Sequence, residues 1–131
     1  MIQVSSLLKV VDKTGITSVK CIKVLSTIKN RIACIGDVIV CSVHRLNPKK
    51  FQKVKLFKKK KFLKGTLHRG LIIRSCVNFK RMSSIFLKFN ENSVVLVNKR
   101  VVPVSNRVYG PVLRELCMRL PSLGCVTRFM I

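Results

Sequence analysis

The chain has 131 residues, 48% of them hydrophobic, which suits one domain with one hydrophobic core. Its 27 Lys and Arg against four Asp and Glu give a net charge of +23, an excess that predicts a polyanionic partner: RNA, DNA or an acidic membrane. No apolar run approaches the roughly 18 residues needed to span a bilayer, because Asp37, Arg69 and Arg74 interrupt the longest ones, and no secretory signal is visible. We therefore expect a single polyanion-binding domain, residues 1–131, without membrane insertion.

Short runs rich in Val and Ile recur along the chain between turn residues, a pattern typical of β-strands. The predicted strands are Leu7–Val11, Val19–Leu25, Asp37–Val43, Thr66–Cys76, Ile85–Phe89 and Val94–Val97. Turn signals lie at Lys13-Thr14-Gly15 and Ile35-Gly36-Asp37, and Asn90-Glu91-Asn92 is expected to join two adjacent antiparallel strands. Five or six short strands of this kind favour a closed barrel.

The pattern changes after Tyr109-Gly110-Pro111, where apolar residues recur at helical spacing: Val112, Leu113, Leu116 and Leu120. Proline suits the first turn of a helix, so a short helix is expected to begin near Pro111 and to end at Pro121. The sequence thus predicts a mainly β fold, with a small barrel over about residues 1–105 and a C-terminal helical part over about 106–131.

One segment, residues 49–64 (KKFQKVKLFKKKKFLK), combines nine lysines with three phenylalanines. Ammonium groups neutralise phosphates and release counterions, and interspersed aromatic rings can stack on bases. The alternative is a solvated, self-repelling hairpin whose Phe side chains only cap the barrel. We interpret the segment as an extended basic loop that contacts RNA. Its candidate RNA-binding residues are Lys49, Lys50, Lys53, Lys58, Lys59, Lys60 and Lys61.

Groups for catalysis are scarce, because a general acid and base need two titratable groups in one cleft. Asp12 and Asp37 can satisfy backbone donors in turns, and Glu115 can pair with the adjacent arginine. His44 and His68 have no neighbouring Cys or acid, so we interpret them as contacts to RNA or solvent rather than metal ligands. No phosphate-binding loop or serine-nucleophile motif is present. The sequence predicts neither an enzyme nor a cofactor.

The six cysteines contain no C-x-x-C pair, and most lie in apolar runs: Cys21, Cys34, Cys41, Cys76, Cys117 and Cys125. Their burial habit favours free, buried thiols over disulfides or a metal site. Arginines outside the lysine loop fall in turns and at strand ends, at Arg31, Arg69, Arg74, Arg81, Arg100 and Arg107. Because guanidinium groups suit bidentate phosphate contact, this distribution indicates a broad RNA-binding surface.

Several phrases of the sequence carry a more specific indication when they are taken in order. They are MIQVSSLLKVVDKTGI at the start, CIKVL at Cys21–Leu25, GDVIVCSV at Gly36–Val43, KGTLHRGLIIR at Lys64–Arg74, SVVLVN at Ser93–Asn98 and NRVYGPVLREL at Asn106–Leu116. Together they resemble the universal L-fourteen family of large-subunit ribosomal proteins, from Met1 to about Arg119. The last phrase is the most specific, since it resembles the family's Gly-Pro-Val and Arg-Glu-Leu motif almost position for position.

The resemblance implies a five-stranded β-barrel with a helical C-terminal part that is assembled into the large ribosomal subunit without catalytic activity. It implies contacts to large-subunit rRNA and neighbouring ribosomal proteins, and an intersubunit bridge to small-subunit rRNA. A ribosome-silencing factor is a further candidate partner. Basic residues that match the family's motifs are candidate rRNA contacts: Lys9, Lys23, Arg74, Arg107 and Arg114. Gly110 and Pro111 are expected to set the turn into the helix.

Three segments depart from the family pattern. Residues 48–65 are longer and richer in lysine than the usual bacterial loop, so their RNA contacts cannot be inherited. The family's Asp-Gly turn before the fifth strand is replaced by Arg81-Met82-Ser83-Ser84. The tail PSLGCVTRFMI differs from the usual ending, which affects the expected docking surface of a silencing factor.

The compartment follows from weaker signals. The family motif begins at Met1 without a removable presequence, and Lys, Ile, Phe and Asn are abundant while acids are scarce. This composition favours an organelle-encoded protein of the mitochondrial matrix over a plastid or a bacterial cytoplasm. Two other functions compete with the ribosomal one: a free barrel module that binds single-stranded RNA, and peripheral attachment to an anionic membrane through the lysine loop.

Overall fold

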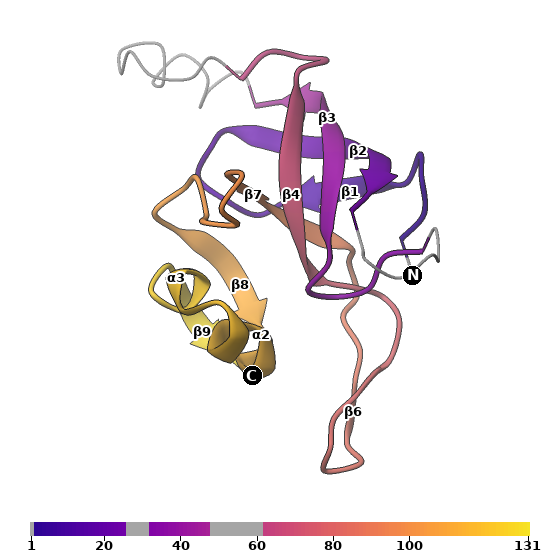
Figure 1. Ribbon diagram of the computed structural model, residues 1–131, viewed down its shortest axis with the longest axis vertical. Helices are drawn as coiled ribbons and strands as arrows, with labels where there is room; N and C mark the ends of the chain where they lie inside the picture. The colour runs from indigo at the N-terminus through magenta and orange to yellow at the C-terminus, as the bar shows by residue number, and fades with distance from the viewer. Residues whose placement is uncertain (1, 26–31, 48–61) are drawn as a thin grey trace.

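The computed structural model describes residues 2–25, 32–47 and 62–131. Strands dominate it, and the helices are short and close to the C-terminus (Figure 1). In chain order the elements are β1 (Leu7–Val10), β2 (Ile16–Val24), β3 (Val38–Leu46), β4 (Leu67–Arg74), β5 (Phe79–Lys80), β6 (Phe86–Leu87), β7 (Ser93–Val97), β8 (Val108–Val112), α2 (Arg114–Arg119), α3 (Pro121–Gly124) and β9 (Thr127–Met130).

Five strands close into a barrel in the order β1-β2-β3-β4-β7, which confirms the predicted fold class. Neighbouring strands run antiparallel except β1 and β7, which pair in parallel and complete the ring. Closure pairs every strand on both sides and so removes exposed sheet edges. The interior is filled by alternate residues of the strands, among them Leu8, Val19, Ile39, Ile72 and Val94.

Strand β7 and the second half of β4, residues 70–74, are buried on both faces, unlike the other barrel strands. Their inward residues fill the barrel, while Leu71, Ile73 and Val95 point outward into a second apolar cluster. This second cluster is completed by residues of the C-terminal part, including Val112 and Leu116. Burial on two faces explains why residues 71–73 in β4 and 94–97 in β7 are continuous apolar runs rather than alternating ones.

The C-terminal part differs in detail from the sequence prediction. Pro111 lies in β8, and the helix begins three residues later at Arg114, while Pro121 is the first residue of α3 instead of a helix end. Strand β8 forms because it pairs in parallel with β9 and because the Tyr109 N–H donates to the Val11 carbonyl at 2.8 Å. These tertiary hydrogen bonds outweigh the local helical pattern.

A hairpin of β5 and β6 projects from the barrel as an arm, which we define as residues 79–87 (Figure 1). The strand expected at Ile85–Phe89 is reduced to two residues, and its partner β5 was not predicted. The Asn90-Glu91-Asn92 turn therefore does not join adjacent antiparallel strands, since β6 pairs with β5 while β7 pairs with β1 and β4.

The other predicted turns are confirmed by positive φ angles of 89° at Gly15 and 94° at Gly36. The predicted roles of Asp12 and Asp37 are also confirmed. The Asp12 carboxylate accepts the Thr14 N–H at 2.9 Å, and Asp37 accepts the Cys34 N–H at 2.8 Å. Asp12 also accepts the Leu96 N–H at 3.1 Å, which ties the end of β1 to β7.

The cysteines divide into two groups. Burial was predicted correctly for Cys21, Cys41 and Cys117, and wrongly for the three exposed thiols, which lie in turns or loops: Cys34, Cys76 and Cys125. Burial raises the pKa of the Cys41 thiol to about 12 and also raises the pKa of Cys21, so both favour the neutral thiol. Within the described ranges, none of the helices has the length and hydropathy to cross a membrane.

Candidate nucleic-acid interface

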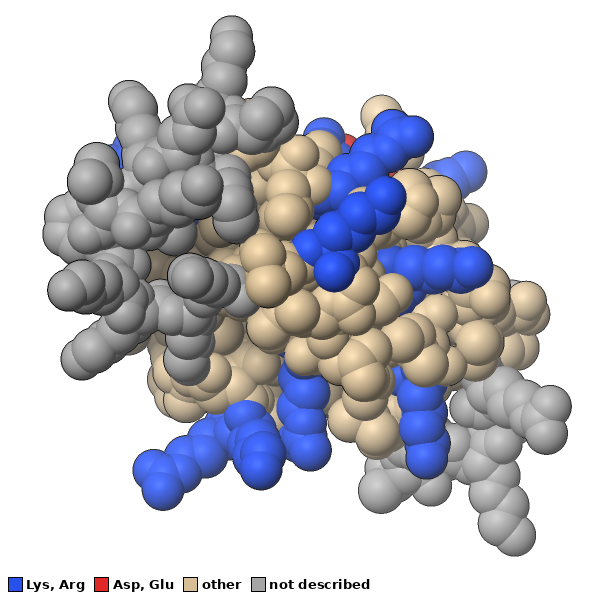
Figure 2. Space-filling model, turned by 90° about the horizontal axis from the view of Figure 1, so that it is seen from above, with Lys and Arg blue, Asp and Glu red and all other residues tan. Residues whose placement is uncertain are grey.

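Exposed lysine and arginine side chains occur on the barrel, on the arm and in the C-terminal part. Figure 2 shows them spread across one face, on which acidic side chains are almost absent. Among the described residues, the exposed basic ones are Lys9, Lys13, Lys20, Lys23, Arg45, Lys64, Arg69, Lys80, Lys88, Lys99, Arg100, Arg114, Arg119 and Arg128. They come from the barrel, the arm and the C-terminal helix, so they form a broad surface rather than a single cleft.

The four acidic residues of the chain are all engaged in the fold. Asp12 and Asp37 accept backbone N–H groups, as described above. Glu91 pairs with Lys9 and Arg74, and Glu115 pairs with Arg81. Most surface cations thus have no carboxylate of this chain to neutralise them, and phosphates can do so instead.

One row of polar and basic residues crosses the outer face of three barrel strands. The register places Lys9 of β1 opposite Ser18 of β2, and Ser18 opposite Arg45 of β3. Neighbouring strands lie about 4.8 Å apart, so the backbone positions of Lys9 on β1 and Arg45 on β3 are roughly 10 Å from each other. Both are exposed, which suits contact with successive phosphates of a backbone that crosses the strands.

A second basic position lies over β3, β4 and β7, at a shallow hollow of about 350 Å³. Arg69 of β4 and Lys99 after β7 line it, and the Arg69 Nη1–H points to the Lys99 carbonyl at 3.5 Å. Arg69 was expected to belong to the broad basic surface, whereas Lys99 was missed. The pairing of β4 with β7 brings them together, and only a correct strand register could have predicted it.

Arg74 was a candidate RNA contact, but the structure places its side chain, only 8% exposed, inside the fold. Its Nη1 donates to Glu91 Oε1 at 2.7 Å, and its Nη2 donates to the Tyr109 carbonyl. Burial lowers the pKa of Arg74, and the nearby Glu91 carboxylate opposes that shift. Arg74 therefore joins β4 to the base of the arm and to β8.

Lys9 shares the Glu91 carboxylate with Arg74 and donates to Oε2 at 2.7 Å, but its side chain is 59% exposed. The pKa of Glu91 is lowered, chiefly by this hydrogen bond, with further contributions from Ser93 and Arg74, while burial raises it. Because its side chain remains accessible, Lys9 can contact RNA while it is paired with Glu91.

The other candidates lie apart from one another. Lys23 is exposed on β2, Arg107 is half-buried before β8, and Arg114 is exposed at the start of α2. The predicted lysines at positions 49–61 fall outside the described residues. Phe62 is buried at 8% exposure in the barrel cluster, with its ring 4.9 Å from that of His68. For this one phenylalanine, the alternative interpretation as a cap on the barrel is confirmed.

Glu115 does not pair with its neighbour Arg114, as the sequence suggested. Its Oε1 lies 2.6 Å from Nε of Arg81, which is far away in the chain at the tip of the arm. The pKa of Glu115 is lowered by a backbone hydrogen bond and by Arg81, against the effect of burial. This ion pair connects the arm to the C-terminal helix.

The family model described as ribosomal protein L14p/L23e matches residues 1–125 of the chain. The match spans the barrel, the arm and both C-terminal helices, so it covers the elements that carry most of the basic surface and ends before β9.

Proposed function

The chain belongs to the ribosomal protein L14p/L23e family, and from this premise we propose that it binds large-subunit rRNA through its basic surface and helps to form an intersubunit bridge. The family is structural and non-enzymatic, and its place is the large subunit of the ribosome. Its members have rRNA and ribosomal proteins as partners. The proposal assigns the family's role to particular residues of this chain.

The observation that carries the proposal is a contrast: many cations are exposed, whereas the carboxylates of the acids are already bound by groups within the fold. The chain carries a net charge of +23, and all four of its acids have partners within the fold. A charge of this size destabilises an isolated compact chain, and a polyanion removes that repulsion. The exposed cations also lie on several sides of the barrel, which suits a protein embedded in RNA better than one that grips a single strand in a groove.

The proposed rRNA contacts combine residues on the described surface with the lysine loop. On the described surface they are Lys9, Lys23, Arg45, Arg69, Lys99, Arg107 and Arg114. In the loop they are Lys49, Lys50, Lys53, Lys58, Lys59, Lys60 and Lys61, because lysines at this density neutralise phosphates without a fixed geometry. Arg74 is left out, since its side chain is buried and both of its terminal nitrogens donate within the fold.

We further propose the ribosome of the mitochondrion as the location, on the strength of abundant Lys, Ile, Phe and Asn with few acids. A ribosome-silencing factor that docks on the C-terminal part is proposed as an additional partner. Fractionation of organelles with the tagged full chain tests the location, and affinity capture of that factor with the purified subunit tests the partner.

Co-sedimentation of the tagged full chain through a sucrose gradient at moderate salt tests the function. We expect the chain in the large-subunit fraction, and ribonuclease treatment should release it. The competing function, a free module for single-stranded RNA, predicts binding to arbitrary RNA in ribosome-free fractions, with a strong salt dependence. Recovery of the chain only in those fractions would refute the ribosomal assignment.

A further inference from the structure

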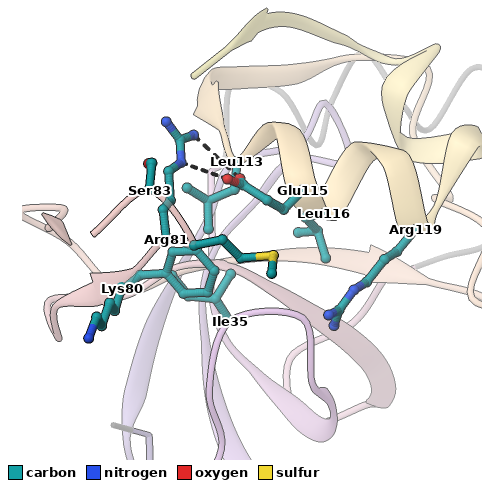
Figure 3. Close-up of a pocket in the computed structure, with 10 residues that line it drawn as sticks. Ile35, Lys80, Arg81, Ser83, Leu113, Glu115, Leu116 and Arg119 are labelled. Carbon is teal, nitrogen blue, oxygen red and sulfur yellow. Dashed lines mark hydrogen bonds and ion pairs between the residues drawn. The ribbon is translucent and has the colours of Figure 1, made fainter. Parts of the chain in front are cut away.

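A groove of about 560 Å³ lies between the arm and helix α2 (Figure 3). Three parts of the chain build its walls: Ile35 from the turn before β3, Phe79 and Met82 from the arm, and Leu113 and Leu116 around the start of α2. The Arg81–Glu115 ion pair lies along one side and holds the arm to the helix. Binding sites for apolar groups commonly have volumes of about 300–1,000 Å³, so this groove is large enough for side chains of a partner.

The apolar part of the groove is unsuited to phosphate. Its five apolar residues present aliphatic and aromatic carbon, with which a phosphate–sugar backbone forms no hydrogen bond, while the other lining residues are polar or charged. The apolar surface continues on the arm, where Met82 is fully exposed and Ile85 and Phe86 are 56% and 60% exposed. Methionine is an unbranched, adaptable side chain that recurs at protein-binding surfaces. An exposed apolar patch beside an apolar groove indicates a protein partner.

The charges around the groove indicate what kind of protein it receives. Lys80 and Arg119 lie on opposite sides of it (Figure 3), and among the described residues no carboxylate pairs with either of them. Glu115 is the one acid of the lining, and Arg81 already neutralises it at 2.6 Å. The groove therefore presents apolar walls between two cations, and complementarity requires carboxylates on the occupant. A second copy of this chain, also at +23, does not meet that requirement.

We propose that this groove docks a segment of a neighbouring protein that carries one or more large apolar side chains flanked by Asp or Glu. The apolar side chains enter between Phe79 and Leu116, and the carboxylates pair with Lys80 and Arg119 at the two sides. The inference deepens the proposed function and rests on it, because it adds one protein partner of defined chemistry to an otherwise RNA-facing molecule.

Photo-cross-linking from the groove tests the proposal. Met82 is replaced by benzoylphenylalanine in the tagged full chain, the particles are purified and irradiated, and the cross-linked segment is identified by mass spectrometry. The same replacement at Leu67, a 62% exposed residue of β4 outside the groove, is the matched control. We expect position 82, but not position 67, to cross-link to a protein segment in which acids outnumber bases. Cross-links from position 82 to rRNA alone, to a basic segment or to this chain itself, or none at all, would overturn the proposal.

Charge reversal at the sides of the groove gives an independent readout. Replacing Lys80→Glu together with Arg119→Glu should lower the cross-link yield per incorporated chain by roughly tenfold, because like charges then face the acidic segment. Lys88 and Arg128 are also exposed but do not line the groove, so the matched pair Lys88→Glu with Arg128→Glu should leave the yield unchanged. Equal reductions in both pairs would contradict the role of the two cations.

The two proposals can fail separately. A chain that is absent from the large-subunit fraction refutes the proposed function, whatever its groove binds. A chain that is present there, yet gives no cross-link from position 82 to an acidic segment, refutes the groove proposal alone.

Discussion

Gly110 lies against the guanidinium group of Arg74 so closely that a Cβ atom at position 110 would be 2.9 Å from both terminal nitrogens of the arginine. Gly110 also has a φ of 83°, a conformation that residues with a side chain rarely adopt. The absence of a side chain lets Arg74 reach the Tyr109 carbonyl and Glu91 together. This glycine and this arginine thus connect β8 to the barrel and to the base of the arm.

Replacing Gly110→Ala should destabilise the protein more than replacing Gly65→Ala. Gly65 has a similar φ of 85°, but a Cβ atom at that position would meet nothing within 4 Å. Both changes cost about 1–2 kcal/mol for the left-handed backbone. At position 110 we expect about 1–3 kcal/mol more, because Arg74 must move and its buried hydrogen bonds break. Urea unfolding of the full chain measures the two effects, and equal destabilisation would contradict this explanation. In an Arg74→Ala background the difference between the two positions should shrink.

Glu91 should make stability depend on pH below neutrality. Its pKa is held down in the folded state, above all by the hydrogen bond from Lys9. The stabilisation is therefore complete above the unfolded pKa of about 4.3 and is lost as the pH falls through the lower folded value. Glu91→Gln should be less stable than the wild type at pH 7 by about 1–3 kcal/mol, since Arg74 keeps a weaker acceptor. The difference in free energy of unfolding between the wild type and Glu91→Gln should become smaller as the pH falls. Parallel unfolding curves from about pH 6 to about pH 3, which bracket that pKa, test this, and a constant gap would exclude the mechanism.

The Arg81–Glu115 ion pair should matter little for global stability. Its side chains are 22% and 41% exposed, so solvent screens the attraction. A double-mutant cycle with Arg81→Ala and Glu115→Ala should give a coupling free energy of about 0.2–1 kcal/mol. A coupling above that range would mean that the arm is a more integral part of the fold than its solvent exposure indicates.

Arg69 and Lys99 should contribute to RNA affinity through charge alone. Replacing both by Gln should reduce the slope of log K against log salt by about 0.7–0.9 for each phosphate that is no longer neutralised. The double variant Arg81→Gln with Glu115→Gln is the control, because it removes an ion pair whose two residues are not among the proposed rRNA contacts, and it should leave the slope unchanged. Filter binding of the full chain to large-subunit rRNA over a salt series measures both. An unaltered slope in the Arg69 and Lys99 variant would remove this hollow from the proposed interface.

Replacing Lys58 to Lys61 by Glu should weaken rRNA binding or subunit assembly while the barrel stays folded. The barrel closes through β1, β2, β3, β4 and β7 without any residue of that segment. Circular dichroism reports the fold, and incorporation into the large subunit reports binding. A variant that is unfolded but retains normal rRNA affinity would contradict this prediction, because the four lysines would then support the fold rather than RNA binding.

The barrel could be predicted from the sequence because its strands show alternating or continuous apolar residues. They are separated by turn residues such as Gly15 and Gly36, whose effect on the backbone is local. The C-terminal part could not, because β8 depends on hydrogen bonds to β9 and to Val11, which a local helical pattern does not reveal. The arm was predicted only in part: the expected strand Ile85–Phe89 contains β6, but β5 was missed, since a two-residue strand shows no alternation of apolar and polar residues.

The same distinction holds for the interface. Composition predicted a basic surface and a polyanionic partner, and the family motifs selected Lys9, Lys23 and Arg114, all of which are exposed. Motif matching could not tell that Arg74 points inward, because its burial depends on Gly110 and Glu91, both distant in the chain. The contribution of Lys99 and the groove beside Arg119 likewise required the three-dimensional arrangement.

A cryo-electron microscopy map of the large subunit purified through a tag on this chain tests the central claim most directly. We expect the barrel within the subunit, with Arg69, Lys99 and Arg45 against rRNA phosphates and Arg74 turned inward to Glu91. A map in which the barrel is absent, or in which these exposed cations face solvent while uncharged surface meets the rRNA, would contradict it.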